Sequence, residues 1–478
     1  MSSQPPEREP SRPLARLRRE LGVLESYAAL IGILVGAGIF RVTSTAYAST
    51  GASVILGYLV LAPAVLATSV AYVVFLSTPL GHEPGAEYAH IGSVFGNGRV
   101  AFLGAWLKLV SYMGACAFLA VALGDYLFEL ADMLGLTRGL SGIEADEARH
   151  VLALASLVFF WSIHAWGVRW FGRIQVAMCV GLGLSIVVLV VPGVFAIRTV
   201  NYSPFFARGG GGFFAALPPL FFAYAGFEAL AHTAGEVRDS TKTLPRVFVR
   251  GIALTALVFV SMTAVALGVL PAERVLASPT PMADAAAVYL PFGTAALVAL
   301  GAILAVATSL NASIFVPSRL MIVLAADGLL PAWLARVEHR TGTPVVGLTV
   351  TLAGAALLLL SRQVGLALTA SVLALVLLYG LHSLALLRLP RANPALFASV
   401  TARVPLRWQR VAGAVSLVSM LTLVLCQLVQ DCRVITTTSL GQRWEGGTLT
   451  ALELVLAWTS IGLLVRGLRP GRGRREDS

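Results

Sequence analysis

Long apolar stretches follow one another along almost the whole of this chain, and they constrain its fold more than any other feature. A helix of about 20 apolar residues can cross the hydrocarbon core of a bilayer. With 57% hydrophobic and only 12% charged residues, the chain lies far from the composition of soluble proteins. The sequence therefore predicts an all-α polytopic membrane protein. We expect twelve transmembrane helices, at about residues 22–49, 51–77, 99–128, 150–168, 172–197, 212–233, 246–271, 290–325, 344–361, 364–388, 408–430 and 448–467.

The segments between these stretches are too short to form a separate soluble domain. We expect one membrane domain over residues 21–468, with a disordered cytosolic tail before it (1–20) and a basic cytosolic tail after it (469–478). The first tail is rich in Pro and Arg and lacks the apolar core and cleavage site of a signal peptide.

The basic residues are distributed unevenly between the two sides of the predicted helices. Of 35 Lys and Arg residues, 25 fall on the side of the N-terminus if the chain crosses the membrane at each stretch. Because positively charged loops stay in the cytoplasm, both termini are predicted to be cytoplasmic, in a plasma or inner membrane. This bias accounts for the net charge of +11, and no basic surface with interleaved aromatic residues indicates a nucleic acid partner.

Two glycines, Gly36 and Gly38, interrupt the first apolar stretch near its middle. Glycines are common where membrane helices pack closely, and this interpretation requires no break. Alternatively, the helix unwinds there, which a membrane tolerates only where the freed N–H and C=O groups line a cavity. Freed N–H groups attract a carboxylate and freed carbonyls attract an ammonium, so such a break is suited to the backbone of an α-amino acid.

A second interruption lies in the sixth apolar stretch, within PPLFFAYAGFEALAHTAGEV (218–237). It contains a pair of prolines, a central Ala-Tyr-Ala-Gly and an acidic residue in an otherwise apolar setting. Inverted-repeat transporters form their substrate site where two discontinuous helices, five helices apart, meet near the midplane. The two interruptions have this spacing, and a pocket between them is therefore predicted.

Four stretches of the sequence form a recognisable set. They are GAGIF (36–40), PGAEYAHIGSVFG (84–96) followed by GAW (104–106), FFAYAGFEALAHTAGEVRDSTKTLPR (221–246) and SLNASIFVPSRLMIVLAADGLLPAWLARVEHRTGTPV (309–345). In order and spacing they resemble the amino acid permeases of the amino acid–polyamine–organocation superfamily. The resemblance implies a LeuT-type 5+5 inverted repeat with broken helices 1 and 6. Its two repeats would cover residues 22–197 and 212–388, and two peripheral helices would follow at 408–467.

The same resemblance implies where a substrate would bind. The N–H groups of Gly36, Ala37 and Gly38 would hold its carboxylate, and carbonyls around the two breaks would receive its ammonium. Phe222 matches an aromatic position that caps the substrate, although a plain core aromatic is the alternative. The residues expected at the substrate site are Ile33, Leu34, Gly36, Ala37, Gly38, Phe222, Ala223, Ala225 and Ser313.

Two ionisable residues, Glu228 and Lys108, lie inside apolar stretches, where an unpaired charge is costly. The resemblance associates the position of Glu228 with proton-linked gating, and a structural acid bonded to nearby backbone is the alternative. Lys108 could extend its long side chain to the inner surface. We instead hypothesise that Lys108 and Glu228 form an ion pair that closes the inner gate.

The coupling ion is the least constrained property. Some proton-coupled relatives carry a lysine on helix five in place of a sodium ion, and the corresponding stretch RIQVAMCVGLGLSIV (173–187) has none. Thr308 and Ser309 could offer hydroxyl oxygens to a sodium ion beside helix one, although such residues usually bond their own backbone. We expect proton rather than sodium coupling, with exchange or uncoupled transport also open, and no metal or organic cofactor.

Small and apolar residues predominate among the predicted pocket residues, so a secondary active transporter of neutral amino acids is expected. A cationic amino acid or polyamine antiporter is an alternative, as is a transporter-like amino acid sensor without net flux. No catalytic motif or metal-binding spacing indicates an enzyme. The loop 129–149 has no cysteine that could join a heavy chain, so we expect a monomer or homodimer in the lipid bilayer.

Overall fold

The computed structural model describes residues 17–468, with gaps at residues 37, 83, 97, 138–139, 141, 279–280, 292–294, 363 and 446–448. Over the described residues the secondary structure is helical, apart from an isolated parallel β-bridge between Leu21 and Val237. The longer helices are α3 (Val54–Leu76), α5 (Gly98–Met133), α6 (Ile143–Ala165), α7 (Val168–Gly193), α10 (Ser240–Val269), α13 (Ala295–Ala326), α14 (Val345–Leu360), α15 (Val364–Ala392), α17 (Leu406–Thr437) and α19 (Ala451–Leu468).

Shorter helical elements connect and flank these. The α-helices are α1 (Val23–Leu34), α2 (Thr43–Thr50), α4 (Glu87–Phe95), α8 (Gly209–Phe222), α9 (Ala229–His232), α11 (Ala272–Ala277), α12 (Pro281–Tyr289), α16 (Pro394–Ala398) and α18 (Leu440–Glu445). A π-helical segment, η1, covers Gly38–Val42, and 3-10 turns are η2 (Gly51–Ser53), η3 (Pro79–His82), η4 (Val194–Ala196), η5 (Thr199–Tyr202), η6 (Thr233–Gly235) and η7 (Ala332–Ala335).

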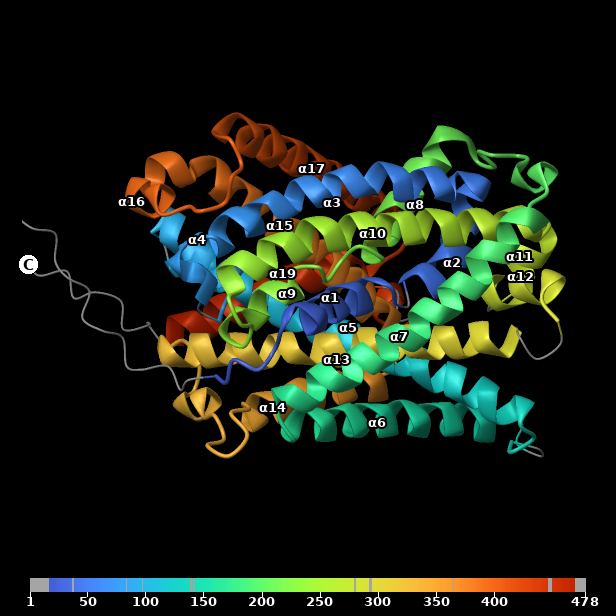
Figure 1. Cartoon of the computed structure of the whole chain (residues 1–478), viewed down its shortest axis with the longest axis horizontal. Helices are drawn as coiled ribbons and strands as arrows, with labels where there is room; N and C mark the ends of the chain where they lie inside the picture. The colour runs from blue at the N-terminus through green and yellow to red at the C-terminus, as the bar shows by residue number, and fades with distance from the viewer. Residues whose placement is uncertain are drawn as a thin grey trace, which may run out of the picture.

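The long helices lie side by side along the longest axis of the molecule (Figure 1). Nine stretches of the described residues are long and apolar enough to cross a membrane, and α8 and α14 are shorter apolar helices. The predicted polytopic helical membrane protein is therefore confirmed. Each of the twelve predicted stretches overlaps helical residues, but twelve crossings stay a prediction.

Helix α5 occupies the centre of the bundle, where it packs against α13 and α15. The outer helices α6, α7 and α17 instead expose large apolar side chains, such as Val158, Leu184 and Leu425. A face of this kind is stable against hydrocarbon rather than water, because burial in lipid removes it from water. Buried charged groups are also present inside the bundle, among them Lys108 of α5.

Both interruptions expected in the apolar stretches are present. Helix α1 ends at Leu34, the next two residues bend, and the chain resumes helical geometry at Gly38. Helix α8 ends at Phe222, and six residues of turn separate it from α9. The two interrupted segments touch, since α1 contacts α9 and η1 contacts α8.

Local sequence explains why the chain unwinds at these places. Pro218 and Pro219 lie inside α8 and cannot donate to the preceding turn, which weakens the helix just before it ends. Gly226 follows with φ of 101°, a value that residues with a side chain rarely adopt. In the first interruption Val35 leaves the helical region, with φ of −83° and ψ of 69°.

The chain before α1 lies against the segment that follows α9. The Leu21 N–H donates to the Glu236 carbonyl at 3.0 Å, and the Arg238 N–H donates to the Leu21 carbonyl at 2.9 Å. These bonds cover the end of the bundle that holds α4 and α9, which is called the strapped end below. Only residues 17–20 of the predicted N-terminal tail, and none of the predicted tail 469–478, are among the described residues.

Candidate functional site

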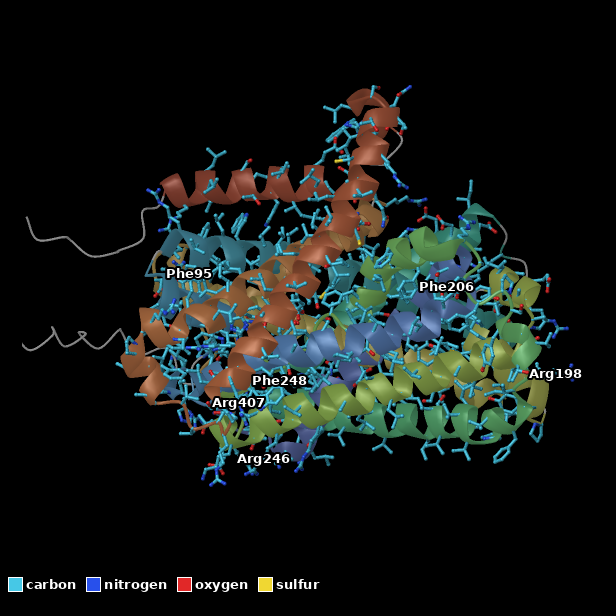
Figure 2. All side chains as sticks on the ribbon, turned by 90° about the horizontal axis from the view of Figure 1, so that it is seen from above. Phe95, Arg198, Phe206, Arg246, Phe248 and Arg407 are labelled. Carbon is cyan, nitrogen blue, oxygen red and sulfur yellow. The ribbon has the colours of Figure 1, made fainter. Side chains whose placement is uncertain are left out.

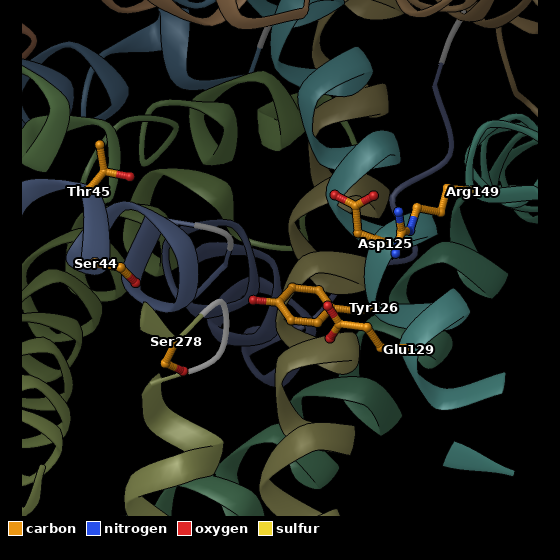
Figure 3. Close-up of a pocket in the computed structure, with 7 residues that line it drawn as sticks. All are labelled: Ser44, Thr45, Asp125, Tyr126, Glu129, Arg149 and Ser278. Carbon is orange, nitrogen blue, oxygen red and sulfur yellow. The ribbon is translucent and has the colours of Figure 1, made fainter. Parts of the chain in front are cut away.

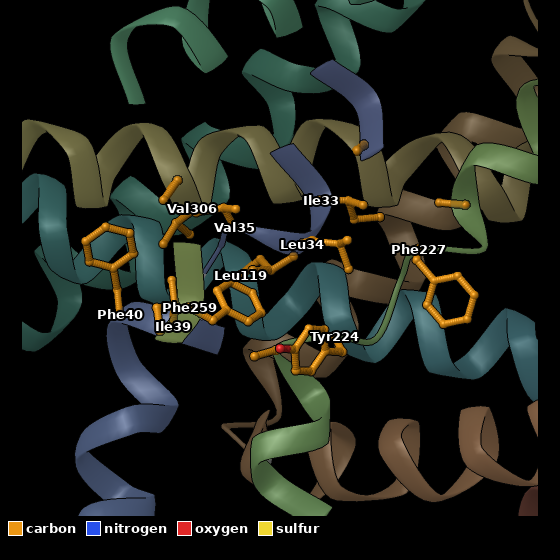
Figure 4. Packing of buried hydrophobic residues seen from close by; sticks show 14 of the residues in the cluster. Ile33, Leu34, Val35, Ile39, Phe40, Leu119, Tyr224, Phe227, Phe259 and Val306 are labelled. Atoms are coloured by element: carbon orange, nitrogen blue, oxygen red, sulfur yellow. The ribbon is translucent and has the colours of Figure 1, made fainter. Parts of the chain in front are cut away.

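A small cavity lies where the two interruptions meet. Its volume is about 30 Å³, room for about one or two water molecules, so the pocket is nearly closed in this conformation. Three of its lining residues, Ile33, Leu34 and Leu119, lie close together in Figure 4. The lining residues are Ile33, Leu34, Gly36, Gly38, Ser111, Tyr112, Ala115, Leu119, Phe222, Ala225, Gly226, Ser309, Ser313 and Leu375.

Most of the residues expected at the substrate site line this cavity. They are Ile33, Leu34, Gly36, Gly38, Phe222, Ala225 and Ser313. Ala223 is not among the lining residues and packs against Gly38 instead, whereas Ala37 lies outside the described residues. Sequence reasoning missed Tyr112, Ala115 and Leu375, which come from α5 and α15 and have no local motif that marks them.

Gly36 and Gly38 are both close-packing positions between helices and part of the break in the first helix. A Cβ atom on Gly36 would overlap Oγ of Ser309, and one on Gly38 would overlap the backbone of Ala223. The close packing of helices expected of membrane glycines is therefore present at both positions. Because the helix is interrupted at the same place, the glycines also leave the backbone accessible to the cavity.

The side of the cavity away from the strapped end carries an aromatic pair. Phe222 is partly buried, and its ring meets that of Phe118 edge to face, with centroids 5.5 Å apart. Along α5, Phe118 lies farther from Lys108 than the pocket residues Ser111 and Ala115 do. The pair therefore lies on the route between the cavity and the opposite end of the bundle.

The hydroxyl groups of Thr308 and Ser309 are already engaged with helix α1. The hydroxyl oxygen of Thr308 lies 3.0 Å from the carbonyl oxygen of Gly32 and 2.8 Å from that of Ala305, and either of them can accept its single hydrogen. Ser309 lies 2.8 Å from the Gly32 carbonyl and 3.0 Å from that of Ile33. The carbonyl oxygens of Gly32 and Ile33 near the end of α1 thus lie within 3.0 Å of the two hydroxyl oxygens.

Glu228 is fully buried and lies directly behind two lining residues, Tyr112 and Gly226, on the side of the strapped end; this layer is called the floor of the cavity. Tyr112 donates to its Oε1 at 2.6 Å, Tyr379 donates to its Oε2, and the Gly226 N–H donates to Oε2 at 3.1 Å. Three donors on two oxygens satisfy the carboxylate without any contribution from a ligand. The floor of the pocket thus holds a carboxyl group whose hydrogen-bond partners the protein itself supplies.

Lys108 lies between two carboxylates rather than at a surface. Its Nζ is 2.6 Å from Oε1 of Glu87 and 3.6 Å from Oε1 of Glu228, and only 2% of the side chain is exposed. The interpretation of Lys108 as a residue that extends to the membrane surface is therefore wrong. The contact with Glu228 exists, but Glu87 is the closer partner.

Glu87, at the start of α4, is the site residue that sequence reasoning missed. Tyr72 donates to its Oε1 at 2.5 Å, and His232 lies 3.2 Å from its Oε2. Burial alone would raise the pKa of Glu87, but the Lys108 ammonium and the His232 hydrogen bond outweigh it and hold the pKa well below 4.5, its usual value. The available signal was an acid and a histidine three residues apart in PGAEYAH, beside an apolar stretch.

A second buried ion pair lies next to the strap. Arg319 of α13 donates to Oε1 of Glu236 at 3.0 Å, and its guanidinium stacks on Phe315 at 3.6 Å from the ring centroid. Both charged side chains are almost wholly buried. Since the backbone carbonyl of Glu236 also holds Leu21, this pair ties α13 to the strapped end.

A larger cavity opens on the other side of the pocket. It has a volume of about 390 Å³ and is lined by residues of α2, α5 and α6 together with Ser278. Figure 3 shows Asp125 beside Arg149, with Tyr126 and Glu129 below them. Along α5, the order Lys108, Leu119, Asp125 places the pocket between the strapped end and this cavity.

This arrangement defines a membrane transport protein: a helical bundle with apolar flanks and a buried pocket at two opposed helix breaks. A family model described as amino acid permease matches residues 21–438. The chain belongs to this family, within the amino acid–polyamine–organocation superfamily, and it is a transporter rather than an enzyme.

Several relatives extend over most of the chain. The branched-chain amino acid permease BcaP of Bacillus subtilis is 26% identical over 339 residues, which cover 69% of this chain and 72% of that protein. The large neutral amino acids transporter small subunit 2 of Oryctolagus cuniculus is 25% identical over 73% of this chain and 65% of its own. The chloroplastic cationic amino acid transporter 9 of Arabidopsis thaliana is 25% identical over 67% of this chain and 58% of its own.

Proposed function

We propose that this chain is a secondary active transporter that moves neutral amino acids across the plasma or inner membrane by alternating access, driven by protons. The observation that carries the proposal is the pocket itself. It combines interrupted backbone, suited to an amino acid's carboxylate and ammonium, with apolar walls and a floor acid that is already satisfied. The named relatives act on branched-chain, neutral or cationic amino acids, so amino acid transport is common to them.

The walls favour a neutral side chain. Leu119, Leu375 and Ala115 offer no partner to a charged group, and burying an unpartnered polar group is unfavourable. Glu228 is the acid that would lie nearest to the side chain of a cationic substrate. Its two oxygens, however, already accept three hydrogen bonds, and one of them faces Lys108. A cationic substrate would have to displace Lys108 or these donors.

Substrate recognition is proposed to use the backbone at the breaks. The N–H groups at Gly36, Ala37 and Gly38 would hold the carboxylate, and carbonyls near Ile33 and Phe222 would receive the ammonium. In the present conformation the Gly36 N–H donates to the Leu34 carbonyl at 2.9 Å, so this bond must open when the substrate binds. Because the cavity holds only about one or two waters now, binding requires the two interrupted helices to move apart. The proposed fold is the LeuT-type 5+5 repeat with twelve crossings over residues 21–468.

The strapped end is proposed to face the cytoplasm. Arg246 and Arg407, which belong to the predicted cytoplasmic segments, lie toward one end of the molecule, and Arg198 of a predicted outer segment lies at the other (Figure 2). This separation supports cytoplasmic termini under the positive-inside rule. In this topology the conformation is closed toward the cytoplasm by the strap, and Lys108 with Glu228 contributes to the closure.

Proton coupling is proposed in preference to sodium coupling because two buried acids, Glu87 and Glu228, lie beside Lys108. The hydroxyl oxygens of Thr308 and Ser309 lie within 3.0 Å of carbonyl oxygens of helix α1, an arrangement that a sodium ion could also use. No disulfide-linked heavy chain is proposed, and the assembly is proposed to be a monomer or a homodimer. The substrate and the lipid bilayer are its partners.

Purified protein in liposomes tests the proposal. We would measure uptake of a panel of radiolabelled neutral, cationic and acidic amino acids and a polyamine, under a proton gradient, a sodium gradient, or with unlabelled amino acid inside. Neutral amino acid uptake driven by protons is the expected result. A preference for cationic substrates would instead support a cationic amino acid or polyamine antiporter. Binding without flux would instead support an amino acid sensor.

A further inference from the structure

The buried polar cluster around Lys108 contains an unequal number of charges. Glu87 and Glu228 are two carboxylates within 4 Å of a single lysine. The neighbouring Arg319 is paired with Glu236 and so does not balance the second carboxylate. With both acids ionised the cluster carries one uncompensated negative charge among buried side chains, which favours uptake of one proton.

The oxygens of the two carboxylates are poor places for that proton, because hydrogen-bond donors already face them. Glu228 accepts from Tyr112, Tyr379 and the Gly226 N–H. Glu87 accepts from Tyr72 and Lys108 at one oxygen and from His232 at the other. A donor facing an oxygen stabilises the ionised form of the acid.

His232 instead offers a free lone pair. Since the Glu87 carboxylate can only accept, Nε2 of His232 must carry the hydrogen of their 3.2 Å contact. In the neutral ring, Nδ1 is then a bare acceptor, and this fully buried atom has no hydrogen-bond partner among the described residues. Protonation at Nδ1 would make an imidazolium whose Nε2–H already bonds the carboxylate of Glu87, its counter-ion.

Lys108 connects this histidine to the substrate pocket. It lies 2.6 Å from Glu87 and 3.6 Å from Glu228, so a shift of its ammonium toward Glu228 leaves Glu87 with His232 as its remaining basic partner. While Lys108 stays on Glu87, its positive charge opposes a second positive charge on His232. The position of one ammonium therefore decides whether His232 binds a proton.

We propose that His232 is the proton-carrying group of this transporter: Nδ1 takes up one proton, with Glu87 as counter-ion, when Lys108 moves from Glu87 to Glu228 at the pocket floor. The inference rests on the proposed function and names its coupling residue. It shifts the proton site from Glu228, the residue indicated by the sequence, to the side of the cluster nearer the strapped end.

The remaining titratable and charged side chains around His232 belong to the helices that pack against the cluster. His90 and His382 are bonded to each other, Nδ1 to Nε2 at 3.1 Å, and have no carboxylate within ion-pair distance among the described contacts. They are therefore weaker candidates for a lasting imidazolium. The titratable and charged groups of the surroundings are Tyr72, Glu87, His90, Lys108, Tyr112, Glu228, Glu236, Arg319, Tyr379 and His382.

The test uses the full chain in liposomes with radiolabelled L-leucine, or with the panel amino acid that gives the largest wild-type counterflow. Two rates are compared for each variant: counterflow at equal pH, which needs no net proton movement, and uphill uptake driven by an acidic outside medium. For H232Q we expect the ratio of uphill uptake to counterflow to fall by about tenfold or more. E87Q removes the uncompensated negative charge and should lower the ratio of uphill uptake to counterflow in the same way. It provides the test of the proposal if H232Q does not fold.

A buried histidine outside the cluster provides the control. His164 is as buried as His232 but bonds the Asn311 carbonyl at 2.8 Å, so H164Q should keep the wild-type ratio. An unchanged ratio in both H232Q and E87Q overturns the inference alone. Wild-type uptake that does not respond to the pH gradient overturns the proton coupling of the proposed function and the inference with it. Absence of wild-type counterflow with every panel amino acid overturns the proposed function and the inference with it.

Discussion

The ammonium of Lys108 lies 2.6 Å from the carboxylate of Glu87, and only 2% of each side chain is exposed. The pair joins α5, which lines the pocket, to α4, which belongs to the strapped end. Because a charge buried without a partner is far more costly than the pair is stabilising, this contact couples the two regions strongly. It is the shortest of the ion pairs that surround the floor of the pocket.

Removing Lys108 should harm the protein more than removing either of its partners. K108M leaves two buried carboxylates without their cation and is expected to cost about 3–5 kcal/mol of stability. E87Q should cost less, since Lys108 keeps Glu228 at 3.6 Å. The double variant K108M/E87Q should recover part of the loss, in thermal unfolding and in counterflow. A double variant as unstable as K108M would contradict the pairing, and the same cycle with E228Q tests the second carboxylate.

A methyl group at either pocket glycine should disrupt the junction of the two breaks. G36A would meet Ser309 and G38A the backbone of Ala223, so each is expected to cost about 1–3 kcal/mol and to impair counterflow. G183A on α7 is the matched control, because no atom lies within 4 Å of the added Cβ there. Melting temperatures of the three variants check the prediction, and equal effects at all three positions would contradict it.

Leu119 should limit the size of the substrate side chain. L119A enlarges the pocket wall on α5, so competition by larger neutral amino acids, such as phenylalanine, should strengthen relative to competition by alanine. L123A, one turn further along the same buried face, should lose about 2–5 kcal/mol of stability without changing this order. Inhibition of counterflow by an unlabelled panel measures both, and an unchanged order in L119A would remove Leu119 from the pocket wall.

The rate of transport should not depend on sodium. Replacing sodium by choline is expected to leave the wild-type rate unchanged, because transport is proposed to be driven by protons. T308A and S309A should each lower the free energy of unfolding by about 1 kcal/mol through lost hydrogen bonds. This loss should be the same with and without sodium. A sodium requirement that either variant abolishes would establish a sodium site and refute proton coupling.

The carboxylate of Glu87 should remain ionised in acid. Its pKa in the folded protein lies well below 4.5, so its contribution to stability is complete above that pH and is lost only as the pH falls through the lowered value. The difference in melting temperature between wild type and E87Q should therefore stay constant from neutral pH down to about 4.5 and shrink only below it. A difference that disappears near neutral pH would mean that Glu87 itself titrates there.

Features that depend on neighbouring residues could be predicted from the sequence. The helices follow from apolar stretches long enough to cross a bilayer, and the interruptions follow from Gly36, Gly38 and the Pro218–Pro219 pair, which act on their own helix. Most residues that the family resemblance indicated for the pocket lie at those interruptions and line the cavity. Tyr112 and Leu375 line the same pocket from α5 and α15, and no local signal marked them.

The sequence by itself determined that this chain is a helical membrane transporter of the amino acid permease family with two interrupted helices, because apolar length, backbone-breaking residues and motifs act locally. Only the tertiary structure decided which charges meet. Lys108 pairs with Glu87 as well as Glu228, and Glu87 with His232, across 21 and 145 residues of chain. A side chain's charge state depends on the partners that folding brings within a few ångströms, and linear order does not specify them.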